Sequence, residues 1–83
     1  MKAIVTVVGQ DRVGVIAAVC AKLAEFNVNV LDISQTVMQG YFTMMMAPEV
    51  SGCNVPLAEL AQRMDELGAS MGLSIRVQRE DIF

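Results

Sequence analysis

Hydrophobic positions along the chain change period from two to about 3.6, and this change predicts a series of strands and helices. Residues 2–8 are β-branched and nearly all apolar, which is typical of a strand covered on both faces. From Val13 to Phe26 apolar side chains recur at helical spacing. Asn27 tolerates a left-handed backbone and is expected to end this helix.

The middle of the chain predicts a β-hairpin. Residues 28–38 form the expected first strand, Gln39 and Gly40 the turn, and residues 41–47 the returning strand. Residues 48–55 are rich in glycine, serine, asparagine and proline, so we expect a loop there.

The last third of the chain predicts a second helix and a final strand. Pro56 fits the first turn of a helix, and Gly72 is expected to end it. The apolar face of this helix consists of Leu57, Leu60, Ala61, Met64, Leu67 and Met71. Residues 73–78 then alternate between apolar and polar side chains, as a half-buried strand does.

The order strand, helix, strand, strand, helix, strand is typical of the ferredoxin-like sandwich. The sequence therefore predicts an α+β fold with a four-stranded antiparallel sheet and two helices on one of its faces. The chain has 83 residues, and we expect residues 1–83 to form a single domain.

Hydrophobic side chains exceed what so small a fold is able to cover. They make up 54% of the chain, whereas a domain of this size buries only about 60% of its unfolded surface. In the first strand Ile4 and Val8 point to one face of the sheet and Ala3, Val5 and Val7 to the other, and two helices shield only one of these faces. We therefore expect a homodimer or a higher assembly, formed through the open face, through an edge strand, or through both.

Composition excludes several classes of function. The net charge of −3 and the pI of about 4.6 oppose binding to nucleic-acid phosphates. Histidine is absent, so the commonest general acid–base group and metal ligand are missing, and we expect no catalysis, metal or cofactor. Cys20 and Cys53 are far apart and are expected to be free thiols.

The sequence also predicts a cytoplasmic location. The longest apolar run, from Val13 to Ala21, is too short for a membrane span and is followed by Lys22. The chain does not open with the basic and apolar regions of an export signal.

The junction between the first strand and the first helix is the expected binding site. It contains two glycines, Gly9 and Gly14, around an Asp-Arg pair. The N–H groups of a first helical turn have no partner within the helix and bind anionic groups, and glycine allows close approach. The glycine spacing matches a phosphate-binding loop, but Val15 and Ile16 replace the required Lys-Ser/Thr pair, so we exclude a nucleotide site.

Several motifs together carry a family resemblance. The motifs are Gly9-x-Asp11-Arg12-x-Gly14-Val15-Ile16, Leu23-Ala24, Asn27-Val28-Asn29-Val30, Ile33-Ser34-Gln35-Thr36, Tyr41-Phe42-Thr43-Met44 and residues 75–83. With these motifs the chain resembles ACT domains over essentially its whole length, and it is most similar to the small stand-alone single-ACT proteins of prokaryotes.

The resemblance implies a ferredoxin-like domain that dimerises, often binds an amino acid at the interface, and regulates a metabolic enzyme or a transcription factor. Asp11 and Asn29 match positions where the family has ligand-contacting side chains, and Gly14 matches the closest backbone approach. The expected ligand-binding residues are Asp11, Arg12, Val13, Gly14, Val15 and Asn29. Many members have proline at the position of Val13, and some amino-acid-binding members have histidine at that of Gly9.

The expected chemistry is simple. Backbone N–H groups around residues 13–16 bind an α-carboxylate, Asp11 pairs with an α-ammonium group, and Asn29 contacts either. The alternative is that Asp11 only caps the helix, which contributes about 0.5–2 kcal/mol, and that Asn29 only satisfies a turn. Under that alternative the chain is a ligand-free dimerising adaptor for a partner protein. We expect Arg12 at the surface or in an ion pair.

Two other functions of the same fold are disfavoured. An RNA-recognition module needs aromatic side chains on both central strands, and Ile4, Thr6 and Val8 provide none. An acylphosphatase-like enzyme has no support beyond the fold, because the sequence shows no convergent catalytic groups.

Overall fold

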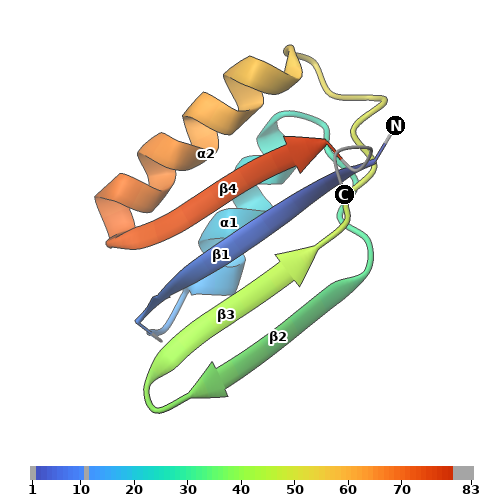
Figure 1. The fold of residues 1–83 in the computed structure, drawn as a ribbon. Helices are drawn as coiled ribbons and strands as arrows, with labels where there is room; N and C mark the ends of the chain where they lie inside the picture. The colour runs from blue at the N-terminus through green and yellow to red at the C-terminus, as the bar shows by residue number, and fades with distance from the viewer. Residues whose placement is uncertain (1, 11, 80–83) are drawn as a thin grey trace.

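The computed structural model describes residues 2–10 and 12–79, which form a four-stranded sheet with both helices on one of its faces (Figure 1). The elements are β1 (Ala3–Gln10), α1 (Val15–Glu25), β2 (Ile33–Met38), β3 (Tyr41–Met46), α2 (Leu57–Met71) and β4 (Leu73–Arg79). The strand order is β2-β3-β1-β4, and every neighbouring pair is antiparallel. The expected α+β, ferredoxin-like fold is confirmed.

Strand alternation places the core between the sheet and the helices. Along β1, Ala3, Val5 and Val7 are fully buried, whereas Val8 is exposed. The other buried strand residues are Phe42, Met44, Met46, Leu73 and Ile75, and the helices add Val15, Val19, Leu23, Leu60 and Met64. Burying one large apolar side chain contributes about 1.5–3 kcal/mol, so this single layer stabilises the fold.

The two helices do not cover β2. By register, Ile33 lies opposite Met46 and Val37 opposite Phe42, so both face the helix side of the sheet. They are nevertheless 47% and 54% exposed. Figure 1 shows the reason, since α1 lies behind β1, α2 lies along β4, and β2 forms the opposite edge of the sheet. Part of the apolar excess is therefore exposed on the helix side of the sheet.

Left-handed residues end several elements, as the sequence predicts. Asn27 has a φ of 60° after α1, and Gly72 has a φ of 71° between α2 and β4. Gln39 and Gly40 have φ values of 52° and 82° and join β2 to β3. Two consecutive positive φ values suit a tight hairpin, because they match the twist of the strands.

The expected strand over residues 28–38 is wrong in its first half. The strand begins at Ile33, because Asp32 has a φ of 51° and interrupts the extended backbone. Before this break, Asn29 forms an isolated bridge with Glu49 through N–H···O bonds of 3.2 and 2.9 Å. Val28 is 5% exposed, so this segment contributes to the core without joining the regular strand.

Smaller differences occur at the ends of other elements. The first helix begins at Val15 rather than Val13, because Gly14 takes a left-handed conformation at its N-cap. Pro56 is the N-cap of α2, with an extended backbone, and so precedes the first turn. Among residues 2–10 and 12–79, no helix has both the length and the apolar composition needed to cross a membrane.

The contact between α2 and β4 requires glycine at position 68. A Cβ atom at Gly68 would lie 2.7 Å from the carbonyl oxygen of Leu73 and 3.2 Å from Cγ1 of Ile75. In a helix interior, replacing glycine by alanine normally stabilises by about 0.5–1 kcal/mol. Here the backbone oxygen leaves no room, so the helix must move away from the strand.

We expect Gly68→Ala to lower the free energy of unfolding by about 1–3 kcal/mol, as overpacking does. Urea unfolding monitored by circular dichroism measures the change. The control is Ala69→Gly at the next, exposed position, where helix propensity alone predicts a loss of about 1 kcal/mol. A Gly68→Ala protein more stable than the wild type would contradict the close approach.

Candidate functional site

The junction between β1 and α1 is shaped by Gly14. This residue is the N-cap of α1 with a φ of 91° and a ψ of 0°, a conformation that side-chain-bearing residues rarely adopt. No side-chain hydrogen bond caps the helix within the described part of the chain. The first N–H groups of an α-helix have no partner within the helix, and the helix dipole adds positive potential there.

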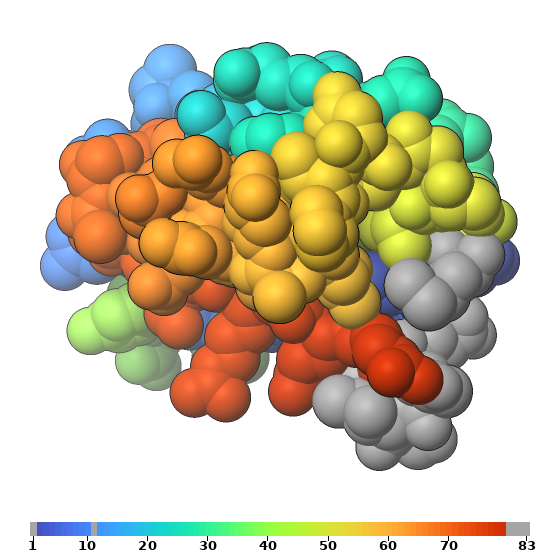
Figure 2. Space-filling view, turned by 90° about the horizontal axis from the view of Figure 1, so that it is seen from above, coloured from blue at the N-terminus to red at the C-terminus, as the bar shows by residue number. Residues whose placement is uncertain are grey.

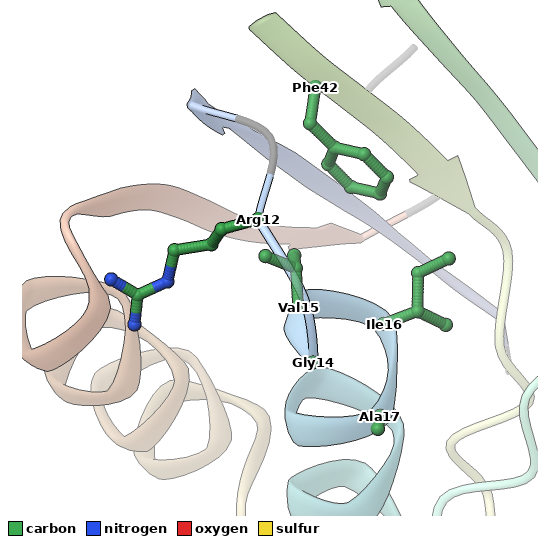
Figure 3. A pocket seen from close by; sticks show the side chains of 6 residues that line it. All are labelled: Arg12, Gly14, Val15, Ile16, Ala17 and Phe42. Carbon is green, nitrogen blue, oxygen red and sulfur yellow. The ribbon is translucent and has the colours of Figure 1, made fainter. Parts of the chain in front are cut away.

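A cavity of about 180 Å³ lies against this first turn. Its lining residues are Arg12, Gly14, Val15, Ile16, Ala17 and Phe42. Figure 3 shows the ring of Phe42, from β3, on one side of the gap and the side chain of Ile16, from α1, on the other. Val15 and Phe42, which both line the cavity, are 2% and 3% exposed, so these two side chains are packed in the core.

The cavity combines apolar walls with polar backbone at one end. A closed apolar cavity of about 150 Å³ holds a benzene-sized group. This cavity is of similar size, and the first turn of α1 borders it. It therefore has room for a small apolar group whose attached anion reaches the helix N-terminus.

Arg12 lines the cavity but does not direct its charge into it. In Figure 3 its side chain extends away from Phe42 and Ile16. The residue is exposed, and it takes part in none of the ion pairs found among the described residues. Its guanidinium group is thus at the surface, and the turn backbone at this residue is what borders the cavity.

The five expected site residues of the β1–α1 junction fall into three groups. Arg12, Gly14 and Val15 line the cavity together, whereas Val13 is fully exposed and does not line it. Asp11 lies outside the described residues. The assignment of these residues to ligand binding stays a prediction.

Asn29 lies at the other end of the sheet. The end of β1 is level with Tyr41 at the start of β3, whereas Asn29 bridges Glu49, beyond the end of β3. Eight residues of extended chain span roughly 26 Å. Asn29 and Gly14 of one copy are thus too far apart to contact the same small ligand.

Two cavity residues, Ala17 and Phe42, were missed by the sequence prediction, which included the backbone but not the side chain of Ile16. Ala17 belongs to the first helical turn, and its place two residues after Val15 was the available signal. Phe42 lines the cavity because it pairs with Gly9 at the end of β1. Strand register is non-local, so no local pattern identifies this residue.

The loop beside Asn29 contains a titrating carboxylate with a defined environment. The hydroxyl of Ser51 donates a 2.8 Å hydrogen bond to Oε1 of Glu49. This hydrogen bond is the largest cause of a pKa for Glu49 below its ordinary value. The backbone of Glu49 also forms the bridge with Asn29. The same residue therefore carries the carboxylate with the lowered pKa and holds the backbone of Asn29.

Comparisons with known proteins agree with the fold and the motifs. A model of the ACT domain family matches residues 2–78. A UPF0237 protein of Bifidobacterium longum is 51% identical over 82 residues, which cover 99% of this chain and 91% of that protein. The structure of an ACT domain protein from Streptococcus pneumoniae matches at 41% identity with a TM-score of 0.88, covering 100% of this chain and 93% of that one.

One more distant structure shares the fold alone. The regulatory subunit of aspartate kinase from Thermus thermophilus, in its ligand-free form, has a TM-score of 0.74 at 21% identity. The match covers 95% of this chain and 51% of that subunit.

We expect Ser51→Ala to raise the pKa of Glu49 towards its ordinary value, because the carboxylate loses its strongest donor. A lowered pKa adds stability above the ordinary pKa, and this contribution disappears as the pH falls through the folded-state value. The free energy of unfolding of the Ser51→Ala variant should therefore change less with pH in that acid range. The measurement is an NMR titration of the Glu49 carboxyl carbon.

The control for this titration is Ser70→Ala, which removes a hydroxyl that donates to the carbonyl of Leu67 on α2. It should leave the Glu49 titration unchanged. An unchanged pKa for Glu49 in Ser51→Ala as well would show that the hydroxyl has no effect on the carboxylate.

Proposed function

The chain belongs to the ACT domain family, whose members are regulatory, ligand-binding domains, and we propose that it is a single-domain, non-catalytic regulator of the cytoplasm. In this proposal it pairs with a second copy and binds a small amino acid at the interface. The observation that carries the proposal is the cavity at the first turn of α1, whose lining residue Phe42 pairs with Val37 on the uncovered strand β2.

The outer edge of β2 supports pairing between copies. Natural edge strands are usually protected by charged side chains, proline or bulges. All six residues of β2 are exposed, and none is charged or proline. The opposite edge strand, β4, carries Arg76 and Arg79 and packs against α2. Of the two edges, β2 therefore fits a second copy better.

Antiparallel pairing through β2 explains why the expected site residues lie far apart. A two-fold axis perpendicular to the sheet sets the end of one β2 beside the start of the other. Asn29 precedes β2, so the copy of Asn29 in the second chain approaches the cavity beside Gly14 in the first. The ligand site of the proposal is composite, with both chains contributing.

The cavity favours an amino acid with a small aliphatic side chain. Its walls are the side chains of Phe42, Val15 and Ile16, and Val37 is the register partner of Phe42 on the next strand. The α-carboxylate binds the N–H groups of the first turn, and Arg12 lines the cavity beside this turn. Asp11 is the proposed partner of the α-ammonium group.

Isothermal titration calorimetry with individual amino acids at millimolar concentration tests the ligand. We expect saturable heat with a small aliphatic amino acid. Ile16→Asp should weaken the affinity at least tenfold, because a second carboxylate then competes for the first turn of α1. Ile16 is 38% exposed, and an acidic residue is favourable at a helix N-terminus, so the variant should fold.

The matched control is Ala24→Asp, which adds the same charge near the other end of α1 and should bind as the wild type does. Absence of saturable heat with every amino acid would contradict ligand binding. The chain would then fit the second candidate, a dimerising adaptor that regulates a partner protein without a ligand.

Pairing is tested by sedimentation velocity at micromolar concentration. We expect Val37→Lys to run at the 9.0 kDa mass of one chain, because a lysine on an edge strand opposes pairing. Val13→Lys, a fully exposed valine outside the sheet, is the control and should keep the mass of the wild type. A wild type that runs as one chain would contradict pairing.

A further inference from the structure

A groove lies between α2 and β4 and shares no lining residue with the proposed ligand site. Figure 2, seen from above, shows these two elements in contact, with α2 in orange and yellow and β4 in red. The start of the helix and the end of the strand lie towards the same end of the molecule in both Figure 1 and Figure 2. The groove has a volume of about 410 Å³, and its lining residues are Leu57, Ala58, Ala61, Val77, Gln78 and Arg79.

Two of the lining residues connect the groove to the core. Val77 pairs with the fully buried Val5 in the register of β4 and β1, so both side chains point towards the helices. Val77 and Leu57 are half-buried and pack against the core cluster. An apolar side chain in the groove would therefore extend the core and remove the exposed parts of Leu57 and Val77 from water.

The groove also borders an edge of the sheet. The strand order is β2-β3-β1-β4, so within the described residues β4 pairs with β1 alone. The outer edge of such a strand has unpaired N–H and C=O groups, and natural proteins often cover it with a helix or a loop. The helix α2 packs against β4 but leaves the groove open. A segment of chain in the groove would complete this cover.

The chemistry of the groove favours a segment with both apolar and acidic residues. Four of the six lining residues are apolar, and Arg79 alone is charged. An occupant that has apolar side chains next to carboxylates is complementary to such a surface. Residues 80–83, which lie outside the described residues, have this composition, with the sequence Glu-Asp-Ile-Phe.

The position and length of this segment also fit the groove. The strand β4 ends at Arg79, which itself lines the groove, so the chain leaves the strand beside it. Four residues of extended chain reach up to about 14 Å. A closed cavity of about 150 Å³ holds one benzene-sized group, and the groove is more than twice as large. It therefore has room for the side chains of Ile82 and Phe83 together.

Attachment to β4 decides which copy of the segment fills the groove. A short flexible tether gives the attached segment an effective concentration in the millimolar range. The same segment of a separate chain, present at micromolar concentration, competes poorly with it. The segment of the same copy is therefore the favoured occupant.

We propose that residues 80–83 fold back into the groove between α2 and β4 of their own chain. Ile82 and Phe83 occupy the apolar part of the groove, and the two carboxylates of the segment lie beside Arg79. The segment acts as a strap that fastens the end of β4 to the start of α2 and covers this edge of the sheet. Its position is independent of the proposed ligand and of pairing through β2.

Nuclear Overhauser effects in the wild-type chain test this contact directly. We expect effects between the ring protons of Phe83 and the methyl groups of Ala61 and Val77, because these two residues line the groove from its two sides. Absence of both effects would overturn the proposal.

Tryptophan fluorescence provides a second test, because the sequence contains no tryptophan. In Phe83→Trp the emission should lie at a shorter wavelength than in urea, because the ring is withdrawn from water. Adding Ala61→Glu should move the emission to its value in urea, since a charged side chain then fills the groove. Ala61 is half-buried and glutamate is a good helix former, so this variant should fold, which circular dichroism checks.

The matched control is Ala69→Glu, which adds the same charge at an exposed position of α2 outside the groove and should leave the emission unchanged. Val37→Lys, which opposes pairing through β2, should also leave it unchanged. Short-wavelength emission that Ala61→Glu did not alter would place the segment elsewhere and overturn the proposal. Emission that moved to the value in urea on dilution would show that the segment fills the groove of another copy, contrary to the proposal.

Discussion

Two helices packed on a four-stranded sheet cover only part of it, and the remaining features of this molecule depend on which part is left open. The core residues of β1, β3 and β4 are buried by α1 and α2. On β2 the corresponding residues, Ile33 and Val37, face the same side and stay about half exposed. Transfer of such side chains from water is favourable by about 25 cal/mol per Å², so the uncovered strand favours association.

The cavity also lies where the helices stop covering the sheet. Phe42 is anchored in the core by the strands on both sides of it, and Ile16 projects from the first turn of α1. Beyond Phe42 the sheet continues into β2, where no helix follows. The cavity at the start of α1 is thus lined by Phe42, whose register partner Val37 lies on the uncovered strand β2. The left-handed Gly14 starts the helix abruptly and leaves its donors beside this cavity.

Local patterns predicted the elements well because hydrophobic period reports burial directly. The alternation that buries Met44 and Met46 and exposes Met45 follows from strand geometry alone. The free thiols of Cys20 and Cys53, in the described part of the chain, also agree with their separation in the sequence. What local patterns lack is information on pairing. The break at Asp32, the distance of Asn29 from the cavity and the contribution of Phe42 all depend on which strands are neighbours.

A ligand site shared between two chains would connect binding to assembly through mass action. If the amino acid contacts Gly14 of one chain and Asn29 of the other, it binds the pair and not the separate chains. Each bound ligand then stabilises the pair by RT ln(1 + [L]/Kd), about 2.7 kcal/mol when the ligand is at a hundred times its Kd. The coupling is reciprocal, so pairing through β2 would raise the affinity for the ligand by the same factor by which the ligand strengthens pairing.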